Sequence, residues 1–422
     1  MKYKKTTLKN GLRILTVPMH ETETATVIVT VGVGSRYETD SEAGISHFIE
    51  HMLFKGTIKR PTFMEITAEV DAFGGEINAY TSKDRTAFYI KADSKHLGQS
   101  LDVLADIYLN SKIDEGELNK EKGAIVQEIA MYEDTPMSNV GNVFEKLLYP
   151  KVALGRDVLG SQKTVKSLTR QKIVAYRDRN YAASDTVICV TGKFNEKKTI
   201  AEIRQLFGGM RRGRTPKLKK VKEIQARPQV SLAYKKTDQT HLVLGVRSFH
   251  HNHPDRFALG LLSVILGGNM SSRLFAEVRE KRGLAYYVRT GVENFHDCGY
   301  LAAQAGVNHD KVVETIQVIL AEYHRMATEK VTEAELRKAK EFIKGHTVMG
   351  LESSDEVASF FIGQEVLKKK IMTADEMFQK IERVKLEDVL RVADKIFLTK
   401  HLNLAIIGPW KDESIFKRIL QL

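Results

Sequence analysis

Apolar residues along the chain form two kinds of pattern. Residues 25–33, 76–81 and 86–92 have the composition or the alternation of β-strands, whereas residues 97–109 and 115–134 repeat with a helical period. Strands and helices therefore follow one another in a mixed order. This order predicts an α+β fold, in which mainly antiparallel sheets are covered by helices packed on them.

The pattern also gives shorter elements near the N-terminus. Two strand-like runs flank Asn10-Gly11, which predicts a hairpin. The helix that carries His47 is expected to stop near Pro61, and a second helix over residues 63–73 is ended by Gly74-Gly75.

The order of elements repeats in the second half of the chain. Residues 70–81 align with residues 278–289, and the closing strands of the two halves end at Gly192 and Gly408. Such self-similarity over a long period indicates a duplicated domain. We therefore expect two homologous domains of the same α+β architecture.

The expected boundaries follow from the repeat. The first domain covers residues 1–207 and the second covers residues 229–422. Residues 208–228 are glycine-containing, basic and aperiodic, which is typical of an interdomain linker. The linker has no aromatic residue on which a base could stack, so its charge does not indicate nucleic-acid binding.

The sequence GISHFIEHMLFKGT places His47, Glu50 and His51 in the order H-x-x-E-H. Residues three and four apart lie on one helical face, and the apolar neighbours predict that this helix is buried. Burying three titratable groups is costly unless a partner such as a metal ion compensates. The order is also the inverzincin signature. The pattern predicts a zinc site with two histidine ligands and Glu50 as the base.

A third ligand is needed, and Glu128 is the best candidate. Glu121 and Glu128 fall on one face of a predicted helix, where Glu128 could ligate the ion and Glu121 could orient a ligating histidine. The alternative is that both are surface acids paired with Lys120 or Lys122. The residues alone leave this alternative open.

The chain resembles the pitrilysin-type zinc peptidases, in particular the short branch that includes mitochondrial processing peptidase and its bacterial relatives. In that family H-x-x-E-H is followed by 76 residues and then glutamate, and the same number separates His51 from Glu128. The resemblance covers nearly the whole chain. It implies that His47, His51 and Glu128 bind one Zn²⁺ per chain, that Glu50 is the general base, and that Glu121 supports a ligand.

The resemblance also implies roles for residues that bind substrate. Family members use an arginine and a tyrosine seven positions later to hold the substrate backbone, and here Arg279 and Tyr286 have that separation. The alternative is that Arg279 is a salt-bridged helix residue and Tyr286 a strand aromatic. Asn78 and Ala79 match the family's edge strand, to which an extended peptide adds as a further strand.

The two halves differ at the metal-binding helix. Aligning Gly56 with Gly267 places Ala258, Leu261 and Leu262 opposite the three motif residues. We therefore expect one chemically active half and one half that serves shape or substrate binding. A separate group of histidines, His250, His251 and His253, is interpreted as loop residues and not as a second metal cluster.

Composition narrows the class of protein. The hydrophobic content of 42% with 28% charged residues is typical of a soluble globular chain, and no apolar run approaches the ~18 residues of a spanning helix. Two cysteines do not suggest a disulfide framework, so a cytoplasmic location is expected. The net charge of +12 is scattered, and we interpret most of it as solvated surface.

These observations predict a zinc-dependent endopeptidase that acts on peptides or unfolded segments bound in extended form between the two domains. By resemblance we expect a homodimer, or a heterodimer with a related chain. From the scattered charge and the lack of a long apolar run we expect no nucleic-acid or membrane partner. The main alternative is a non-catalytic scaffold or a partner subunit of a processing-peptidase-like complex.

Overall fold

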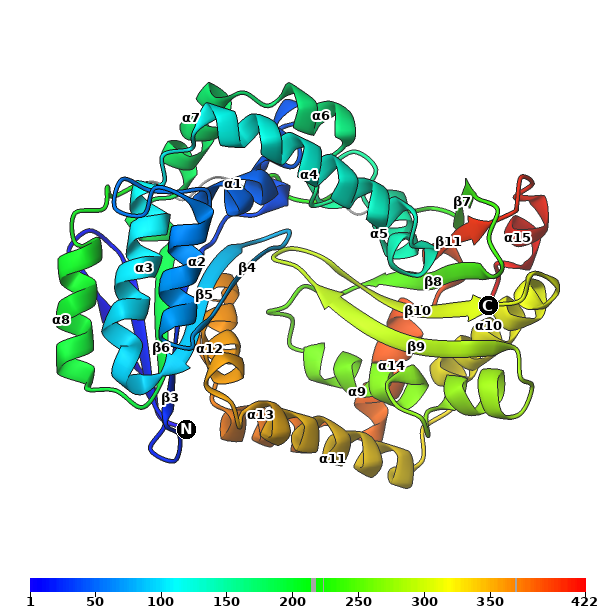
Figure 1. Ribbon diagram of the computed structural model, residues 1–422. Coiled ribbons are helices and arrows are strands. Elements are labelled where there is room, and N and C mark those ends of the chain that lie inside the picture. The colour runs from blue at the N-terminus through cyan, green and yellow to red at the C-terminus, as the bar shows by residue number, and fades with distance from the viewer. Residues whose placement is uncertain (214–217, 223, 369) are drawn as a thin grey trace. The chain divides into compact units, whose positions relative to one another are not determined.

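The computed structural model describes residues 1–213, 218–222, 224–368 and 370–422. The chain forms two compact units, and each is assembled from separate parts of the sequence (Figure 1). The first unit consists of Met1–Ala130, Arg156–Lys219 and Val348–Thr373. The second consists of Met131–Gly155, Lys220–Thr347 and Ala374–Leu422.

The first unit contains a six-stranded sheet in the order β1-β2-β6-β3-β5-β4. Its strands are β1 (Lys4–Thr7), β2 (Arg13–Pro18), β3 (Thr24–Val31), β4 (Glu76–Thr81), β5 (Thr86–Asp93) and β6 (Thr186–Gly192). Only the β2–β6 pair is parallel among these described strands. The expected hairpin joins β1 to β2, and Gly11 in its turn has a positive φ of 94°, which glycine adopts without strain.

The second unit contains a five-stranded sheet in the order β7-β11-β8-β10-β9. Its strands are β7 (Gln229–Tyr234), β8 (Thr240–Ser248), β9 (Ala285–Asn294), β10 (Gly299–Val307) and β11 (Leu402–Gly408). The order matches β2-β6-β3-β5-β4 position by position, including the parallel pair at β7–β11. The α+β fold and its duplication are thereby confirmed.

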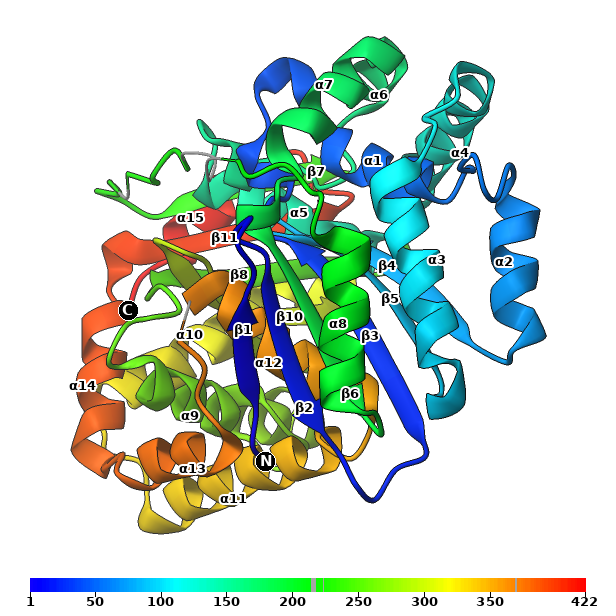
Figure 2. The same cartoon turned by 90° about the vertical axis from the view of Figure 1, so that its left-hand side faces the viewer.

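Helices cover both faces of the first sheet. Its unit holds α1 (Ile45–Leu53), α2 (Phe63–Ala72), α3 (Leu97–Asn110), most of α4 (Glu115–Glu133), α6 (Gln162–Ser167), α7 (Arg170–Asn180), α8 (Glu196–Phe207) and α12 (Ser354–Lys368). Figure 2 shows α3 and α8 on one side of the sheet and α12 on the other. The main core lies under α1 and α3, and a smaller apolar cluster lies under α12.

The second unit has the corresponding helices. They are α5 (Pro136–Leu148), α9 (Arg256–Gly267), the π-helical turn η6 (Phe275–Glu280), α10 (Val312–Thr328), most of α11 (Glu333–Gly350), α13 (Ala374–Glu382), α14 (Leu386–Ile396) and α15 (Ser414–Ile419). Helix α9 stands where α1 stands in the first unit, and its Ala258, Leu261 and Leu262 are buried in the apolar core.

Two helices pack on the sheet of the opposite half of the sequence. Helix α5 follows α4 in the chain but packs on β7, β8 and β11, where Phe144 is buried. Helix α12 lies in the second half of the sequence but packs on β3 and β6, where Phe361 is buried. The consecutive domains expected over residues 1–207 and 229–422 therefore differ from the compact units. Apolar periodicity predicts each helix but carries no information on which sheet receives it.

The end of the motif helix and the expected linker can also be compared with the structure. Helix α1 ends at Leu53 instead of near Pro61, because Gly56 turns the chain with a φ of 116°. A Cβ at Gly56 would lie 2.1 Å from the Pro61 carbonyl oxygen, so only glycine fits this turn. The expected linker of residues 208–228 lies between α8 and β7, and its residues 214–217 and 223 are outside the described residues.

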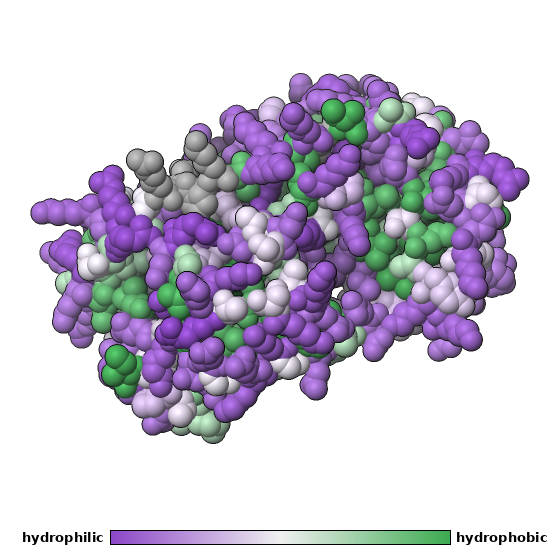
Figure 3. Space-filling model, turned by 90° about the horizontal axis from the view of Figure 1, so that it is seen from above, coloured by the Kyte–Doolittle hydropathy of each residue, from purple (hydrophilic) through white to green (hydrophobic). Residues whose placement is uncertain are grey.

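The surface of the chain is mixed. The face seen in Figure 3 is mainly hydrophilic, with hydrophobic side chains in small separate groups. Among the described residues, no helix has both the length and the apolar character needed to cross a membrane.

The packing of α12 on the first sheet can be tested by replacing a large buried side chain of this helix with alanine. Phe361 is 1% exposed, and Phe361→Ala should lower the free energy of unfolding by about 3–5 kcal/mol through lost burial and a residual cavity. Phe63, which is 45% exposed, offers a matched control whose replacement by alanine should cost less than about 1 kcal/mol. Urea denaturation of the three proteins provides the measurement. Equal losses for the two variants would contradict the packing of α12 on the first sheet.

Candidate metal centre

Helix α1 begins at a defined point. The carboxylate of Glu38 accepts hydrogen bonds from the backbone N–H groups of Gly44, at 2.8 Å, and Ser46, at 2.9 Å. Gly44 has a φ of 92°, and a Cβ there would lie 2.4 Å from the Leu159 carbonyl oxygen. The acidic group satisfies N–H groups that have no partner within the helix. These contacts fix the start of the helix that carries the motif.

The two motif histidines are neighbours on α1. The ring centroids of His47 and His51 are 4.5 Å apart, and His47 is buried whereas His51 is half-buried. The predicted burial of the helix is confirmed, since its apolar residues are fully buried: Phe48, Ile49, Met52 and Leu53.

Helix α4 brings a carboxylate to these rings. Oε2 of Glu128 lies 3.7 Å from Nε2 of His47 and 3.7 Å from Nε2 of His51. One ligand atom from each of the three residues lies within 4.8 Å of the others. Among the described residues, this is the single group of three or more such side chains with that spacing.

The spacing of the three residues fits a metal ion. A distance of 3.7 Å is too long for a hydrogen bond between imidazole and carboxylate. Ligands on a tetrahedral zinc ion at its usual bond lengths are roughly 3.3–3.5 Å apart. Burial first, and the neighbouring His51 second, lower the pKa of His47 to about 3, so its imidazole is neutral and can offer a lone pair. The donor set is therefore suited to zinc.

Glu121 lies one step behind His51. Its Oε1 is 2.7 Å from Nδ1 of His51, and its Oε2 is 2.6 Å from Nζ of Lys55. Burial raises the pKa of Glu121, but hydrogen bonds from His51 and Lys55 outweigh burial and leave that pKa below its usual value. An anionic Glu121 holds the N–H of His51 on Nδ1, so that Nε2 is free to bind a metal.

The alternative that Glu121 and Glu128 are surface acids paired with Lys120 or Lys122 does not hold for Glu121. Lys120 pairs with Glu117 at 2.7 Å and Lys122 donates to Asn119 at 3.4 Å, whereas Glu121 contacts His51 and Lys55. Lys55 is a residue that sequence reasoning missed. It lies beyond the end of α1, and no sequence pattern links it to Glu121.

The carboxylate of Glu50 has its own partner. Oγ1 of Thr81, the last residue of β4, donates a hydrogen bond of 2.5 Å to Oε2 of Glu50. Burial raises the pKa of Glu50, while the hydrogen bond from Thr81 and the charge of His51 oppose that rise. A raised pKa makes a carboxylate a better proton acceptor near neutral pH. Thr81 was also missed, because no sequence pattern links it to Glu50.

Asn78 and Ala79 lie on β4, which is an edge strand of the first sheet as expected. The backbone N–H of Ala79 donates to Oδ1 of Asn78 at 2.8 Å, so it is not used in the ladder with β5. This N–H belongs to the unpaired edge of the strand. Such an edge is a template for an added strand.

Arg279 and Tyr286 lie together in the second unit. The guanidinium carbon of Arg279 in η6 is 5.4 Å from the ring centroid of Tyr286 in β9 and 4.9 Å from that of Phe275. The carboxylate of Glu280 lies 3.9 Å from Nε of Arg279, which is a weak ion pair. Tyr286 is 76% exposed, unlike a packed strand aromatic. Both side chains are therefore accessible to a ligand.

Three further histidines lie together in a loop of the second unit. His250, His251 and His253 lie in the connection between β8 and α9, as expected. Nδ1 of His251 is 2.9 Å from the Phe295 carbonyl oxygen, and the ring of His253 stacks on Phe249 at 4.0 Å.

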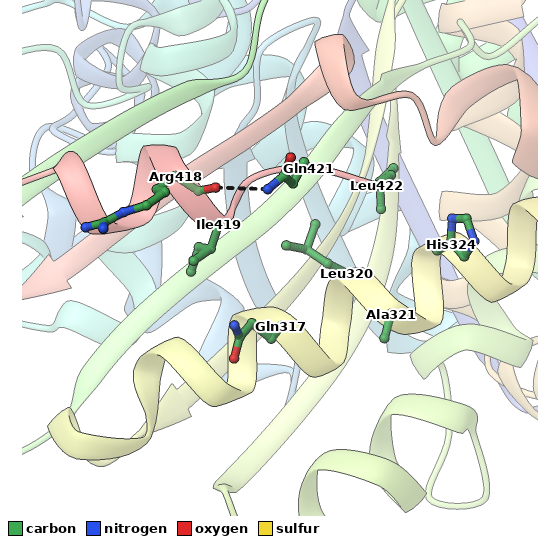
Figure 4. A pocket seen from close by; sticks show the side chains of 8 residues that line it. All are labelled: Gln317, Leu320, Ala321, His324, Arg418, Ile419, Gln421 and Leu422. Atoms are coloured by element: carbon green, nitrogen blue, oxygen red, sulfur yellow. Dashed lines mark hydrogen bonds between the residues drawn. The ribbon is translucent and has the colours of Figure 1, made fainter.

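A cavity of about 580 Å³ lies elsewhere in the second unit, between α10 and the C-terminal residues (Figure 4). It is lined by Gln317, Leu320, Ala321, His324, Arg418, Ile419, Gln421 and Leu422. None of the predicted site residues lines it.

Comparison with known proteins identifies the family. Residues 13–161 match the family described as insulinase (peptidase family M16), and residues 167–343 match the peptidase M16 inactive domain. An uncharacterized zinc protease of Streptomyces coelicolor is 35% identical to the chain, over 97% of this chain and 90% of that protein. The chain belongs to peptidase family M16. The M16 inactive-domain match includes α9, the helix without metal ligands.

A further M16 relative and two solved structures are also similar to the chain over nearly its whole length. An uncharacterized zinc protease of Bacillus subtilis is 36% identical over 96% of this chain and 98% of that protein. The crystal structure of a protease from Helicobacter pylori has a TM-score of 0.91 and 27% identity, and covers 97% of this chain and 99% of its own. An M16 inactive-domain structure from Pseudomonas fluorescens, with a TM-score of 0.88, 19% identity and coverage of 97% and 99%, shares the fold.

Zinc should stabilise this M16 protein through the three residues. Free zinc at 100 times its dissociation constant should add about 2.7 kcal/mol to the free energy of unfolding. Glu128→Gln should remove most of that gain, because an amide replaces the anionic ligand. Glu115→Gln, at the exposed start of α4, should keep it. Thermal denaturation with and without a chelator provides the measurement, and an equal gain in both variants would argue against Glu128 as a ligand.

The contacts of Glu121 with His51 and Lys55 lead to a second prediction, which concerns the affinity for zinc. Glu121→Gln should weaken zinc binding about 10- to 100-fold, because the group that holds His51 and its N–H loses its charge. Competition with a chromogenic chelator would measure the affinity, again with Glu115→Gln as the control. An unchanged affinity would show that Glu121 has no part in orienting His51.

Proposed function

We propose that this M16 protein is a zinc-dependent endopeptidase that cleaves peptides or unfolded protein segments. The observation that carries the proposal is the convergence of His47, His51 and Glu128, with 3.7 Å between carboxylate and imidazole atoms. Glu50 stands between the two histidines on the same buried helix. The relatives named zinc proteases support the same chemistry.

His47, His51 and Glu128 would hold the ion. When bound, zinc lowers the pKa of a coordinated water and polarises a carbonyl group. Glu50 accepts a proton from the attacking water and gives it to the leaving amine, as its raised pKa favours. Glu121 keeps the ring of His51 in one tautomer through this cycle.

The substrate backbone is proposed to add to the free edge of β4. Backbone hydrogen bonds at a sheet edge recognise any extended peptide, which suits an enzyme for unfolded segments. The N–H of Ala79 lies at this edge and donates to Oδ1 of Asn78, a contact that a substrate carbonyl would replace. An extended backbone held there would present successive peptide bonds in a fixed register.

Arg279 and Tyr286 are proposed to hold the substrate from the second domain. Tyr286 is exposed, and its ring rests against the guanidinium group of Arg279, which limits its freedom. Its phenol could donate a hydrogen bond to the oxyanion that develops during attack. Interactions of this kind are worth about 3 kcal/mol of transition-state stabilisation.

A dimer is proposed to complete the substrate chamber, either of two identical chains or with a related partner chain. Sedimentation velocity combined with a cleavage assay at the same concentration tests this part. A fully active monomer would rule it out.

A non-catalytic scaffold is the second candidate. It would bind zinc through the same residues without cleaving peptides. The retention of Glu50 beside the two histidines favours the enzyme, because a structural zinc site has no need of a base.

Cleavage of a quenched-fluorescence peptide mixture tests the proposed function. Glu50→Gln should lower kcat/KM by about 10²- to 10⁴-fold at equal zinc content, because the amide keeps the shape of the side chain but cannot accept the proton. Glu115→Gln should match the wild type. Zinc-loaded wild type that cuts no peptide would support the scaffold, and equal rates for wild type and Glu50→Gln would exclude Glu50 as the base.

A further inference from the structure

The hydroxyl of Thr81 is directed at the proposed base. Thr81 ends β4, and its Oγ1 lies 2.5 Å from Oε2 of Glu50 in α1. The backbone of Thr81 is already paired with Thr86 of β5, so the strand does not need the hydroxyl group for its own structure. The hydroxyl group is therefore available to act on Glu50.

The turn that follows Thr81 is held in place by backbone contacts. The N–H of Ser35 donates to the carbonyl of Ser82 at 3.1 Å, and the N–H of Arg36 donates to that of Lys83 at 3.0 Å. Gly34 approaches so closely that a Cβ there would lie 2.2 Å from the Ser82 carbonyl oxygen.

Buried charged groups secure the same turn. The guanidinium group of Arg36 lies 3.3 Å from the carboxylate of Asp84, and both residues are more than nine-tenths buried. Nζ of Lys83 donates to the carbonyl of Arg156 at 2.6 Å. A hydroxyl group at the end of β4 thus has a fixed position against α1.

We propose that Thr81 is a positioning residue for Glu50, which holds Oε2 and leaves Oε1 as the oxygen that takes up and returns the proton. This inference rests on the proposed peptidase function. The proton moves from the attacking water to Oε1 and from Oε1 to the leaving nitrogen, while the proton of Thr81 stays on its own oxygen.

The hydrogen bond is useful in both states of the base. Oε2 can accept from Thr81 whether Oε1 carries a proton or not. The terminal torsion of a glutamate is otherwise broad, so a carboxylate without this donor samples several orientations. Thr81 also ends the strand to which the substrate is proposed to add. The same strand would therefore fix both the scissile bond and the base.

Kinetics of two substitutions test the proposal. Thr81→Val keeps the shape and removes the donor, and should lower kcat about 10- to 100-fold with little change in KM, zinc content or melting temperature. Thr81→Ser should restore most of kcat. Thr30→Val is the matched control in the same sheet, because the buried hydroxyl group of Thr30 has no hydrogen-bond partner among the described residues.

A double-mutant cycle separates positioning from a general structural effect. In the Glu50→Gln background Thr81→Val should cause no further loss, because Thr81 acts through the carboxylate. A wild-type kcat for Thr81→Val, or an equal loss in both backgrounds, would overturn the proposal. Cleavage that is absent already in the wild type would instead overturn the proposed function.

A crystallographic comparison decides the matter even without cleavage. Crystals of zinc-loaded wild type should show one orientation of the Glu50 carboxylate, and Thr81→Val should show more than one or a rotated group. An identical, single orientation in both would overturn the positioning role.

Discussion

The constraint that governs this structure is the burial of the His47 imidazole beside a second, half-buried imidazole and a carboxylate. His47 lies on a helix whose apolar residues belong to the core of the first unit, and burial there removes water from its imidazole. The helix is fixed at one end by Glu38, and Glu121 with Lys55 fixes the ring of His51. Together these contacts limit the positions that the ring nitrogens of His47 and His51 can take. A metal ion then needs little reorganisation of the protein in order to bind.

The two copies of the fold differ at the helix that follows the strand β3 or β8. In the first unit α1, the helix after β3, carries the two candidate histidine ligands. The corresponding helix α9 buries Ala258, Leu261 and Leu262 and contributes only to the core. The second unit carries its accessible side chains elsewhere, at Arg279 and Tyr286. One copy of the architecture thus carries polar side chains on this helix, whereas the other copy keeps the helix apolar.

Sequence patterns predicted the structure best where residues with metal-binding or acid–base side chains also follow the spacing of a helix. Helical spacing placed His47, Glu50 and His51 on one helical face, and the repeat predicted that both halves have the same order of elements along the chain. The partners Thr81 and Lys55 could not be predicted, because each contact depends on where a turn or a helix end comes to lie in space. The packing of α12 was equally hidden, since an apolar face fits any apolar sheet.

The reciprocal placement of α5 and α12 has a consequence for the origin of the chain. Two separate half-length chains, each lending one helix to the other's sheet, would build the same two units as a domain-swapped dimer. The residues between α8 and β7 then join two subunits head to tail instead of connecting independent domains. In such a molecule each half of the sequence supplies the main core of its own unit, whereas the smaller apolar cluster on the opposite face of each sheet needs a helix from the other half.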